Sequence, residues 1–283
     1  DFLVLTPPPS FQTALTNTGL FLDDQGKFDR ASYQDAVNNG TIPVELNPLL
    51  VNWENYLRTY VNNIMVIDDL ANRQHDCDIL LDHNWFENLE SRYEGILQCS
   101  CTKLLGPQYA LLRPEFTIAK KTIKIRNDKI KRIFIFFGGS DRYNMTSITL
   151  MAINKLELSN IEVDVVIGDN NPYKNKIQNI AESRSLTNIH IQVDDIASIM
   201  ANADIAIGSG GVNTWERICL ELFTLIISFS DNHKVMLKDL DKNGFVEIIG
   251  SMDDIDENII MSAISNVINN QTLIYNKKLK LSK

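Results

Sequence analysis

Apolar residues in the second half of the chain form short continuous runs that alternate with stretches of helical periodicity. Such runs are typical of strands buried on both faces of a parallel sheet. Strands are predicted at Lys131–Phe137, Ile161–Ile167, Ile189–Val193, Asp204–Ile207, Leu225–Phe229 and Phe245–Ile249. Helices are predicted at Met145–Leu156, Pro172–Ser185, Asp195–Ala203, Thr214–Leu222, His233–Asn243 and Asp256–Asn269. This strict alternation predicts a doubly wound α/β domain with a parallel sheet.

The first half of the chain has a weaker pattern. Ile64–Ile67 and Ile79–Leu81 are predicted strands, and Val51–Tyr60 is a predicted helix. Residues 1–47 are atypical: their periodicity is weak, and they contain the run Pro7-Pro8-Pro9, which favours an extended or loop conformation. We assign no fold to that segment.

These patterns divide the chain into two α/β domains. We expect an N-terminal domain over residues 1–118, a linker over 119–130, a C-terminal α/β domain over 131–270 and a tail over 271–283. Residues 119–132 hold seven basic residues and one acidic residue. Such a run is either an anion-steering patch or, as we prefer, a solvated linker.

Composition narrows the function classes. The chain has 283 residues, of which 44% are hydrophobic and 22% charged, as in ordinary globular proteins. Its formal net charge of −9 argues against a general nucleic-acid binder. An anionic small ligand remains compatible, because backbone N–H groups at helix N-termini bind phosphate without net positive charge. No apolar run reaches the roughly 18 residues of a membrane helix, and no signal-peptide pattern is visible. We expect a cytoplasmic protein without nucleic-acid or membrane partners.

The cysteines do not have the spacing of a metal site. Cys77, Cys99, Cys101 and Cys219 include one close pair, with C-x-C spacing, whereas zinc sites usually pair C-x2-C motifs. We expect reduced thiols, no metal and no cofactor.

Two glycine-rich loops follow predicted strands, where open α/β sheets bind ligands. The first is Gly138-Gly139-Ser140-Asp141. Its glycines would allow a close backbone approach to a ligand, or alternatively a tight strand-to-helix turn. The second begins at Gly208 and contains Gly210 and Gly211 before a predicted helix. The N–H groups and the helix dipole would suit a diphosphate, although the loop is neither a Rossmann fingerprint nor a P-loop.

Glu216 has two interpretations of equal weight. Asn213 would be the N-cap of the following helix and Glu216 its N3 residue, as in a capping box. Alternatively, the Glu216 carboxylate accepts hydrogen bonds from both hydroxyl groups of a ribose.

Histidines and paired acids offer further candidate chemistry. His190 alternates within a strand and is expected to be structural. His75 and His83 each lie beside acidic residues, so each is either a general base or, as we prefer, part of a hydrogen-bonded turn. Asp68 and Asp69 end a strand and point to opposite faces, which disfavours joint metal binding. We expect them to hydrogen-bond with Asn72 and Arg73.

One segment has a specific resemblance. Residues 66–82 have the sequence VIDDLANRQHDCDILLD, which closely resembles the UDP-sugar hydrolases of pseudaminic acid biosynthesis. Further matching motifs follow in the same order at Leu105–Phe116, Phe136–Asp141, Asp164–Gly168 and Gly208–Glu216, the last continuing to Arg217 and Cys219. Together they span about residues 50 to 250, and the combination is far more specific than any single motif.

The resemblance implies two Rossmann-like domains with a cleft, as in the glycosyltransferase-B fold, with an incomplete or divergent N-terminal domain and a C-terminal domain that binds the nucleotide. It also implies hydrolysis of UDP-2,4-diacetamido-2,4,6-trideoxy-β-L-altropyranose with inversion. It implies that Gly210 and Gly211 approach the diphosphate, that Glu216 binds the ribose and that Asn232 binds the substrate. Without the resemblance, Asn232 would be interpreted as a helix N-cap. The partner is then a small-molecule UDP-sugar, and we expect a monomer. The candidate substrate-binding residues are Gly138, Gly139, Ser140, Asp141, Gly210, Gly211, Thr214, Glu216 and Asn232.

The resemblance does not extend to the N-terminal segment. The family's proposed general base is a histidine in a Gly-x-Gly-His loop after its first strand, whereas residues 1–50 contain no histidine. We therefore assign no catalytic residue. A UDP-sugar glycosyltransferase and a UDP-sugar-binding protein without turnover remain as alternatives.

Overall fold

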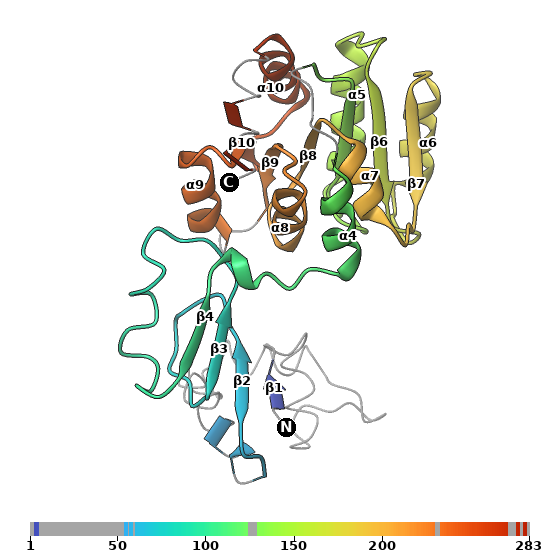
Figure 1. The fold of residues 1–283 in the computed structure, drawn as a ribbon. Coiled ribbons are helices and arrows are strands. Elements are labelled where there is room, and N and C mark those ends of the chain that lie inside the picture. The colour runs from blue at the N-terminus through green and yellow to red at the C-terminus, as the bar shows by residue number, and fades with distance from the viewer. Residues whose placement is uncertain are drawn as a thin grey trace, which may run out of the picture. The chain divides into compact units, whose positions relative to one another are not determined.

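The computed structural model describes residues 3–5, 54–55, 57–58, 60–123, 129–229, 233–270, 276–277 and 280–281. The chain divides into two compact units, Asp1–Ala110 and Leu111–Lys283 (Figure 1). Among the described residues, no helix combines the length and the apolar character that crossing a membrane requires.

The described residues of the first unit form a four-stranded sheet with the order β1-β2-β3-β4. All its strand pairs are parallel. The predicted strands β2 and β3 are confirmed, whereas β1 and β4 were not predicted. Strand β1 pairs Leu3 with Ile64, so the atypical N-terminal segment contributes a strand to this sheet. The strands are β1 (Leu3–Leu5), β2 (Ile64–Ile67), β3 (Ile79–Asp82) and β4 (Thr102–Leu105), followed by the 3-10 helix η2 (Pro107–Tyr109).

Two cysteines lie in the core of the first unit. Cys77 and Cys101 are buried in the cluster that includes Ile64, Leu80 and Tyr93. Their sulfur atoms lie 3.6 Å apart as free thiols. Burial raises the pKa of both thiols, which therefore behave as small apolar side chains.

The second unit contains a six-stranded parallel sheet with the order β10-β9-β8-β5-β6-β7. In chain order this is 3-2-1-4-5-6, the doubly wound arrangement, and it reverses direction between β5 and β8. Every strand predicted for this half is present, and no strand end differs from its prediction by more than two residues. The strands are β5 (Arg132–Phe136), β6 (Glu162–Ile167), β7 (Thr187–Ile191), β8 (Ile205–Ser209), β9 (Thr224–Ser228) and β10 (Val246–Ser251).

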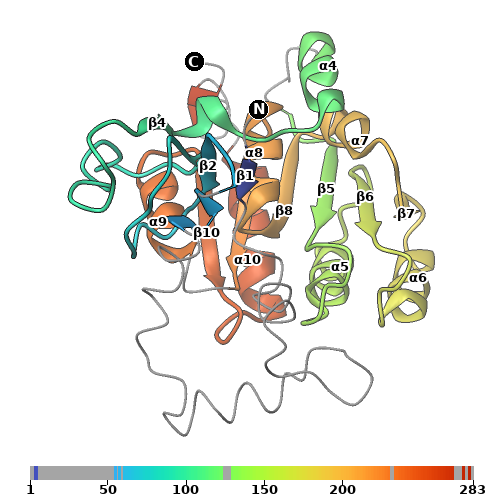
Figure 2. The ribbon, with the colours of Figure 1, turned by 90° about the horizontal axis from the view of Figure 1, so that it is seen from below.

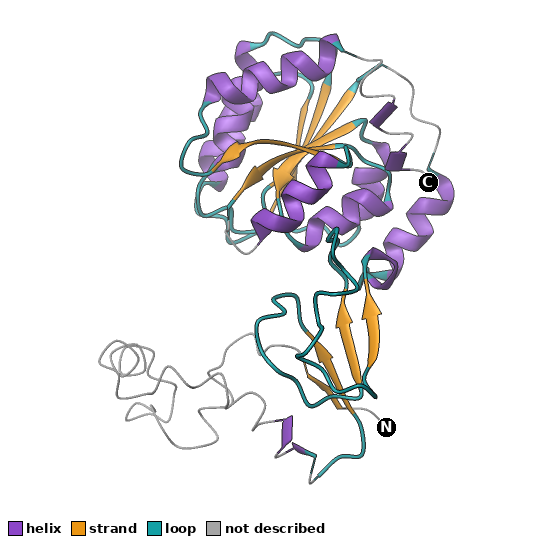
Figure 3. Cartoon of the chain, turned by 90° about the vertical axis from the view of Figure 1, so that its left-hand side faces the viewer, coloured by secondary structure: helices purple, strands orange, loops and turns teal. Residues whose placement is uncertain are grey.

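Helices cover both faces of this sheet (Figures 2 and 3). The two-residue period of β5 puts Ile133 and Ile135 in the core with α5 and α10, while Phe134 points to the opposite core with α4 and α7. The helices predicted for the second half of the chain are all present, whereas part of the helix predicted at Val51–Tyr60 lies outside the described residues. They are α5 (Met145–Lys155), α6 (Lys174–Glu182), α7 (Ile196–Asn202), α8 (Val212–Cys219), α9 (Lys234–Lys242) and α10 (Glu257–Asn269).

The predicted domain boundary and linker differ from the structure. The second unit begins at Leu111, and helix α4 (Pro114–Thr122) runs into the predicted linker 119–130. Phe116 is fully buried and Ala119 nearly so, in the same core as Phe134. The helix therefore belongs to the second unit, because its apolar face packs there while its lysines stay in solvent. Residues 124–128 of the predicted linker lie outside the described part of the chain.

Candidate functional site

A cavity of about 350 Å³ lies within the second unit, at the carboxyl ends of β5 and β6. It is next to the point where the strand order reverses, which is where open α/β sheets bind ligands. Its walls combine aliphatic and aromatic side chains with glycine backbone and a few polar groups. The lining residues are Arg113, Phe136, Gly139, Val166, Ile167, Gly168, Gln192, Val193, Ile196, Asn213 and Glu216.

The first glycine-rich loop approaches the loop that follows β6. Gly168 donates its N–H to the carbonyl oxygen of Gly139 at 3.0 Å. A Cβ atom at Gly168 would lie 2.8 Å from that same oxygen, so only glycine fits there. Gly138 has a φ of +91°, which favours glycine in the turn itself. Of these three glycines, Gly139 and Gly168 line the cavity.

Asp141 has a structural task. Its carboxylate accepts hydrogen bonds from the backbone N–H groups of Met145 at 3.0 Å and Thr146 at 2.8 Å, at the start of α5. The residue is buried, and burial raises its pKa against the opposing effect of these hydrogen bonds. Neither Asp141 nor the exposed Ser140 lines the cavity. We therefore assign Asp141 to the capping of α5 rather than to ligand binding.

The helix that follows the second glycine-rich loop begins earlier than the predicted capping box of Asn213 and Glu216 requires. Helix α8 starts at Val212, and Gly211 is its N-cap with a φ of +129°. The interpretation of Asn213 as the N-cap is therefore wrong. Glu216 lies in the second turn, beyond the N3 position at which it would cap. Of the two sequence-based interpretations of Glu216, the one as a ligand-binding residue remains.

The Glu216 carboxylate faces the cavity. The residue is 8% exposed, and its Oε1 lies 3.7 Å from Nη2 of Arg113. Arg113 also pairs with Glu115 at 2.8 Å. Burial raises the pKa of Glu216, while the charges of Arg113 and Arg217 act in the opposite direction. A carboxylate that lines a cavity and has only a distant cationic neighbour can accept hydrogen bonds from hydroxyl groups of a ligand.

The other predicted residues around this loop do not line the cavity. Gly210 lies against α9, since a Cβ atom there would be 2.5 Å from Cδ1 of Leu237. Thr214 is buried, and its hydroxyl accepts a hydrogen bond from Arg217 at 3.3 Å. Gly211 lies beside His233. Asn232 falls outside the described residues.

Several of the polar groups that line the cavity were not predicted from the sequence. Arg113 and Gly168 belong to the motifs that carry the resemblance, but neither was singled out as a ligand contact. Gln192 and Asn213 also line the cavity. A signal existed for Gly168, because a glycine directly after a buried strand indicates a close backbone approach. No local signal indicates that Arg113 reaches Glu216.

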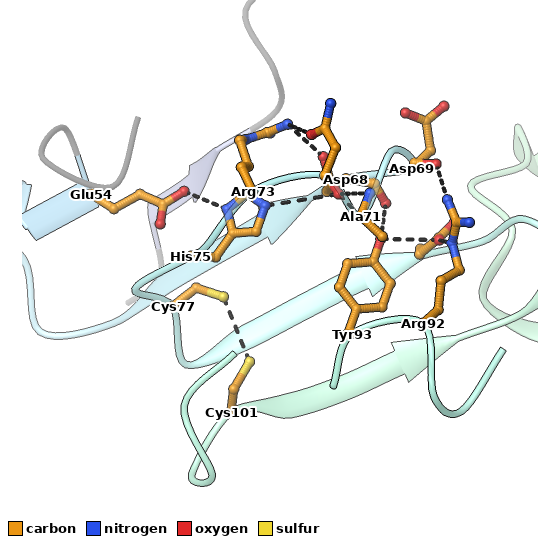
Figure 4. Close-up of polar contacts among 12 residues, drawn as sticks. Glu54, Asp68, Asp69, Ala71, Arg73, His75, Cys77, Arg92, Tyr93 and Cys101 are labelled. Atoms are coloured by element: carbon orange, nitrogen blue, oxygen red, sulfur yellow. Dashed lines mark hydrogen bonds and ion pairs between the residues drawn. The ribbon is translucent and has the colours of Figure 1, made fainter. Parts of the chain in front are cut away.

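The histidine-containing motif of the first unit forms a buried polar network (Figure 4). Asp68 Oδ1 pairs with Arg73 at 2.9 Å, and Oδ2 accepts from the N–H of Ala71 at 2.9 Å and from the Tyr93 hydroxyl at 3.2 Å. That hydroxyl also reaches Asp82 at 3.0 Å. The expected bond between Asp68 and Arg73 is therefore present. Asn72 contributes indirectly, by accepting from Arg73.

His75 lies at the centre of this network. Its side chain is completely buried, with Nδ1 2.8 Å from Glu54 Oε1 and Nε2 3.8 Å from Asp68 Oδ2. Burial lowers the pKa of His75, but Asp68 and Glu54 outweigh that effect and raise it overall. A ring enclosed in this way cannot reach a substrate water. The preferred interpretation, a hydrogen-bonded turn that locks the motif, fits this geometry.

His190 is likewise engaged in structure. Its Nε2 lies 2.9 Å from Asp164 Oδ1, and Asp164 also pairs with Arg132 at 2.6 Å. These contacts link β5, β6 and β7. Throughout the residues that the structure describes, no cluster of three or more His, Cys, Asp or Glu side chains could hold a metal ion.

Comparisons with known proteins support the resemblance found in the sequence. No protein-family model matches the chain. It is 28% identical over 182 residues to the UDP-2,4-diacetamido-2,4,6-trideoxy-β-L-altropyranose hydrolase of Campylobacter jejuni, covering 64% of this chain and 63% of that protein. It is 23% identical over 169 residues to the spore coat polysaccharide biosynthesis protein SpsG of Bacillus subtilis, covering 59% of this chain and 50% of that one. The matches thus span about half to two thirds of these relatives.

Solved structures show the fold. MurG of Acinetobacter baumannii aligns with a TM-score of 0.54 at 12% identity, over 81% of this chain and 64% of that one. The UDP-GlcNAc 2-epimerase of Neisseria meningitidis, bound to UDP-GlcNAc, aligns with a TM-score of 0.54 at 10% identity, over 83% of this chain and 75% of that one. These likenesses confirm the predicted class of two Rossmann-like α/β units of the glycosyltransferase-B type.

Proposed function

We propose that this chain is a metal-independent nucleotide-sugar hydrolase that binds UDP on its second unit. The reaction would cleave the bond between the anomeric carbon and the diphosphate with inversion, releasing the free sugar and UDP. The observation that carries the proposal is the Glu216 carboxylate, which faces a cavity at the carboxyl ends of a doubly wound sheet. The motif resemblance and the Campylobacter jejuni relative support a diacetamido-trideoxy altropyranose as the sugar.

The cavity suits the nucleoside part of UDP. Phe136, Val166 and Ile196 provide apolar surface for a base, and Gln192 provides an amide that can hydrogen-bond with its edge. Glu216 would accept from the ribose hydroxyl groups. The diphosphate would then lie toward Gly210 and Gly211, where the N-terminus of α8 favours an anion.

Glu216→Gln is expected to weaken UDP binding by about 1–3 kcal/mol, because the carboxylate is replaced by a group that accepts through one oxygen. Protein stability should change little, since α8 is capped at Gly211 and not by Glu216. Isothermal titration calorimetry with UDP measures the first effect and thermal unfolding the second.

Glu115→Gln is the matched control for this experiment. Glu115 pairs with the same arginine but does not line the cavity, so its replacement should leave UDP affinity within about twofold of the unmodified protein. An equal loss of affinity in both variants would assign the effect to Arg113 instead. Unchanged UDP affinity in Glu216→Gln would contradict the ribose contact.

Turnover separates the proposed activity from its alternatives. Incubating the protein with the UDP-linked altropyranose and no acceptor should release UDP and free sugar. A glycosyltransferase would release UDP only when an acceptor is added. A binding protein without turnover would bind UDP and release none.

Activity is expected to persist after removal of metal ions. The residues described in the structure hold no cluster of metal-binding side chains, and Asp68 is occupied by Arg73, Ala71 and Tyr93. UDP release measured before and after EDTA treatment should agree within error. An EDTA-sensitive activity that magnesium restores would refute this part of the proposal.

A further inference from the structure

Arg217 is a buried cation directly beneath the second glycine-rich loop. It belongs to α8 and has no exposed surface. Its Nη2 donates to the carbonyl oxygen of Ser209 at 2.6 Å and to the Thr214 hydroxyl at 3.3 Å. Its Nε and Nη1 have no hydrogen-bond partner among the described residues. A guanidinium is seldom buried with donors left unpaired, because its desolvation is costly.

The loop is built around this side chain. A Cβ atom at Gly208 would lie 2.4 Å from Arg217 Nη1 and 2.4 Å from the carbonyl oxygen of Phe136. Only glycine therefore leaves room for the guanidinium between the ends of β5 and β8. This is the point at which the strand order reverses.

The two hydrogen bonds of Nη2 hold both ends of the loop. Ser209 is the last residue of β8, and Thr214 lies in the first turn of α8. In a trans peptide the N–H points opposite to the C=O. Because the Ser209 carbonyl points toward Arg217, the N–H of Gly210 points away from the guanidinium. Arg217 thus fixes the direction of the peptide that leads into the glycine pair.

Within the described part of the chain, no carboxylate forms an ion pair with Arg217. Glu216 is its neighbour on the helix, but successive helical residues point in different directions, and Glu216 faces the cavity. Burial lowers the pKa of Arg217 to about 10, opposed by the charge of Glu216, so the side chain stays charged at neutral pH. A positive charge in a poorly solvated position interacts strongly with an anion placed nearby.

We infer that Arg217 is a positioning residue that holds the Gly208–Gly211 loop in its anion-receiving conformation and supplies the buried positive charge facing a bound diphosphate. This inference rests on the proposed binding of UDP to the second unit. It adds to that proposal a group that does not line the cavity. Its effect should therefore depend on the phosphates of the ligand and not on the nucleoside.

The test compares UDP with uridine, which lacks the diphosphate. Arg217→Met keeps the length of the apolar stem and removes the charge and both hydrogen bonds. We expect a roughly ten- to hundredfold loss of UDP affinity, the usual range for a hydrogen-bonded charge. Uridine affinity, followed by ligand-observed NMR, should change by less than about threefold. Equal losses for both ligands, or unchanged UDP affinity, would overturn the inference.

Arg184→Met is the matched control. Arg184 is part-buried and, like Arg217, donates to backbone carbonyl oxygens, including that of Leu186 at 2.9 Å; burial lowers its pKa too. It lies near the start of β7, at the opposite end of the strands from the cavity. Its replacement should leave the affinities for UDP and uridine unchanged, even if it lowers the Tm.

Two milder variants keep the test decisive if Arg217→Met does not fold. Arg217→Lys keeps the charge but cannot hold both loop ends, so its UDP affinity should fall between those of the unmodified protein and an uncharged variant. Thr214→Val removes one of the two acceptors and should lower UDP affinity by about threefold with uridine unaffected. Full UDP affinity in both would refute the inference. If the unmodified protein binds no UDP, the proposed function itself fails, and this inference fails with it.

Discussion

Replacing Asp68 with alanine is expected to destabilise the first unit by about 3–5 kcal/mol, the usual cost of leaving one member of a buried ion pair without its partner. The variant would leave Arg73, whose side chain is only 10% exposed, without its ion-pair partner Asp68. It would also remove the hydrogen-bond acceptor of the Ala71 N–H and one acceptor of the Tyr93 hydroxyl. Chemical denaturation followed by circular dichroism measures the loss. A change below about 1 kcal/mol would mean that the network does not hold the unit together.

Asp69→Ala is the control for this variant, because it changes the adjacent residue of the same motif. The Asp69 side chain is exposed, and the contact that Arg92 makes with Asp69 uses the backbone carbonyl at 2.6 Å. Alanine keeps that carbonyl. Stability should therefore stay within about 0.5 kcal/mol of the unmodified protein.

The same network predicts a pH dependence. Burial alone would raise the pKa of Asp68, but His75, the Ala71 N–H and Arg73 outweigh it and lower the pKa to about 2. The carboxylate therefore contributes stability above its unfolded pKa of 3.8, and that contribution is lost as the pH falls toward 2. His75, whose pKa is raised, contributes below its unfolded value of 6.5 and loses that contribution as the pH rises through its folded pKa.

Most of the second unit was predictable because buried parallel strands are continuous apolar runs. Helix α4 was not predicted, because it has few buried apolar residues and therefore no clear apolar pattern. It buries only Phe116 and Ala119, and its last turn contains Lys120 and Lys121, which belong to the basic run interpreted as a linker. Strand β4 was missed because Thr102 and Lys103 are exposed and give it no apolar pattern.

The positions of the glycine-rich loops in the candidate site were predictable from the sequence, but the contacts between its side chains were not. Gly211 and Asn213 both satisfy the local rules for a helix start, and in the structure the N-cap is Gly211. Arg113 meets Glu216 only because α4 packs against α8. Contacts of this kind join residues far apart in the chain, and no local pattern in the sequence encodes them.

For a polypeptide that consists of residues 1–283, UDP release from the altropyranose substrate is expected to be about 10²–10⁴-fold slower than by the hydrolase that the chain resembles, the usual contribution of a general base. An inverting hydrolysis needs a base that can reach the attacking water. The resemblance implies a histidine from a Gly-x-Gly-His loop, and residues 1–50 contain none. The structure also argues against two of the remaining histidines as the general base. His75 is enclosed between Glu54 and Asp68, and His190 is hydrogen-bonded to Asp164.

His83 and His233 are then the histidines left to test. Burial lowers the pKa of His83, which keeps its ring neutral, as a base must be, and His233 lies beside Gly211 of the glycine-rich loop. Turnover at the rate of the resembling hydrolase would refute the expected deficit. In that case, loss of UDP release in His83→Ala or in His233→Ala, with UDP affinity retained, would identify the replacement base. His75→Ala provides the contrast, because it should lower stability and change turnover only through unfolding.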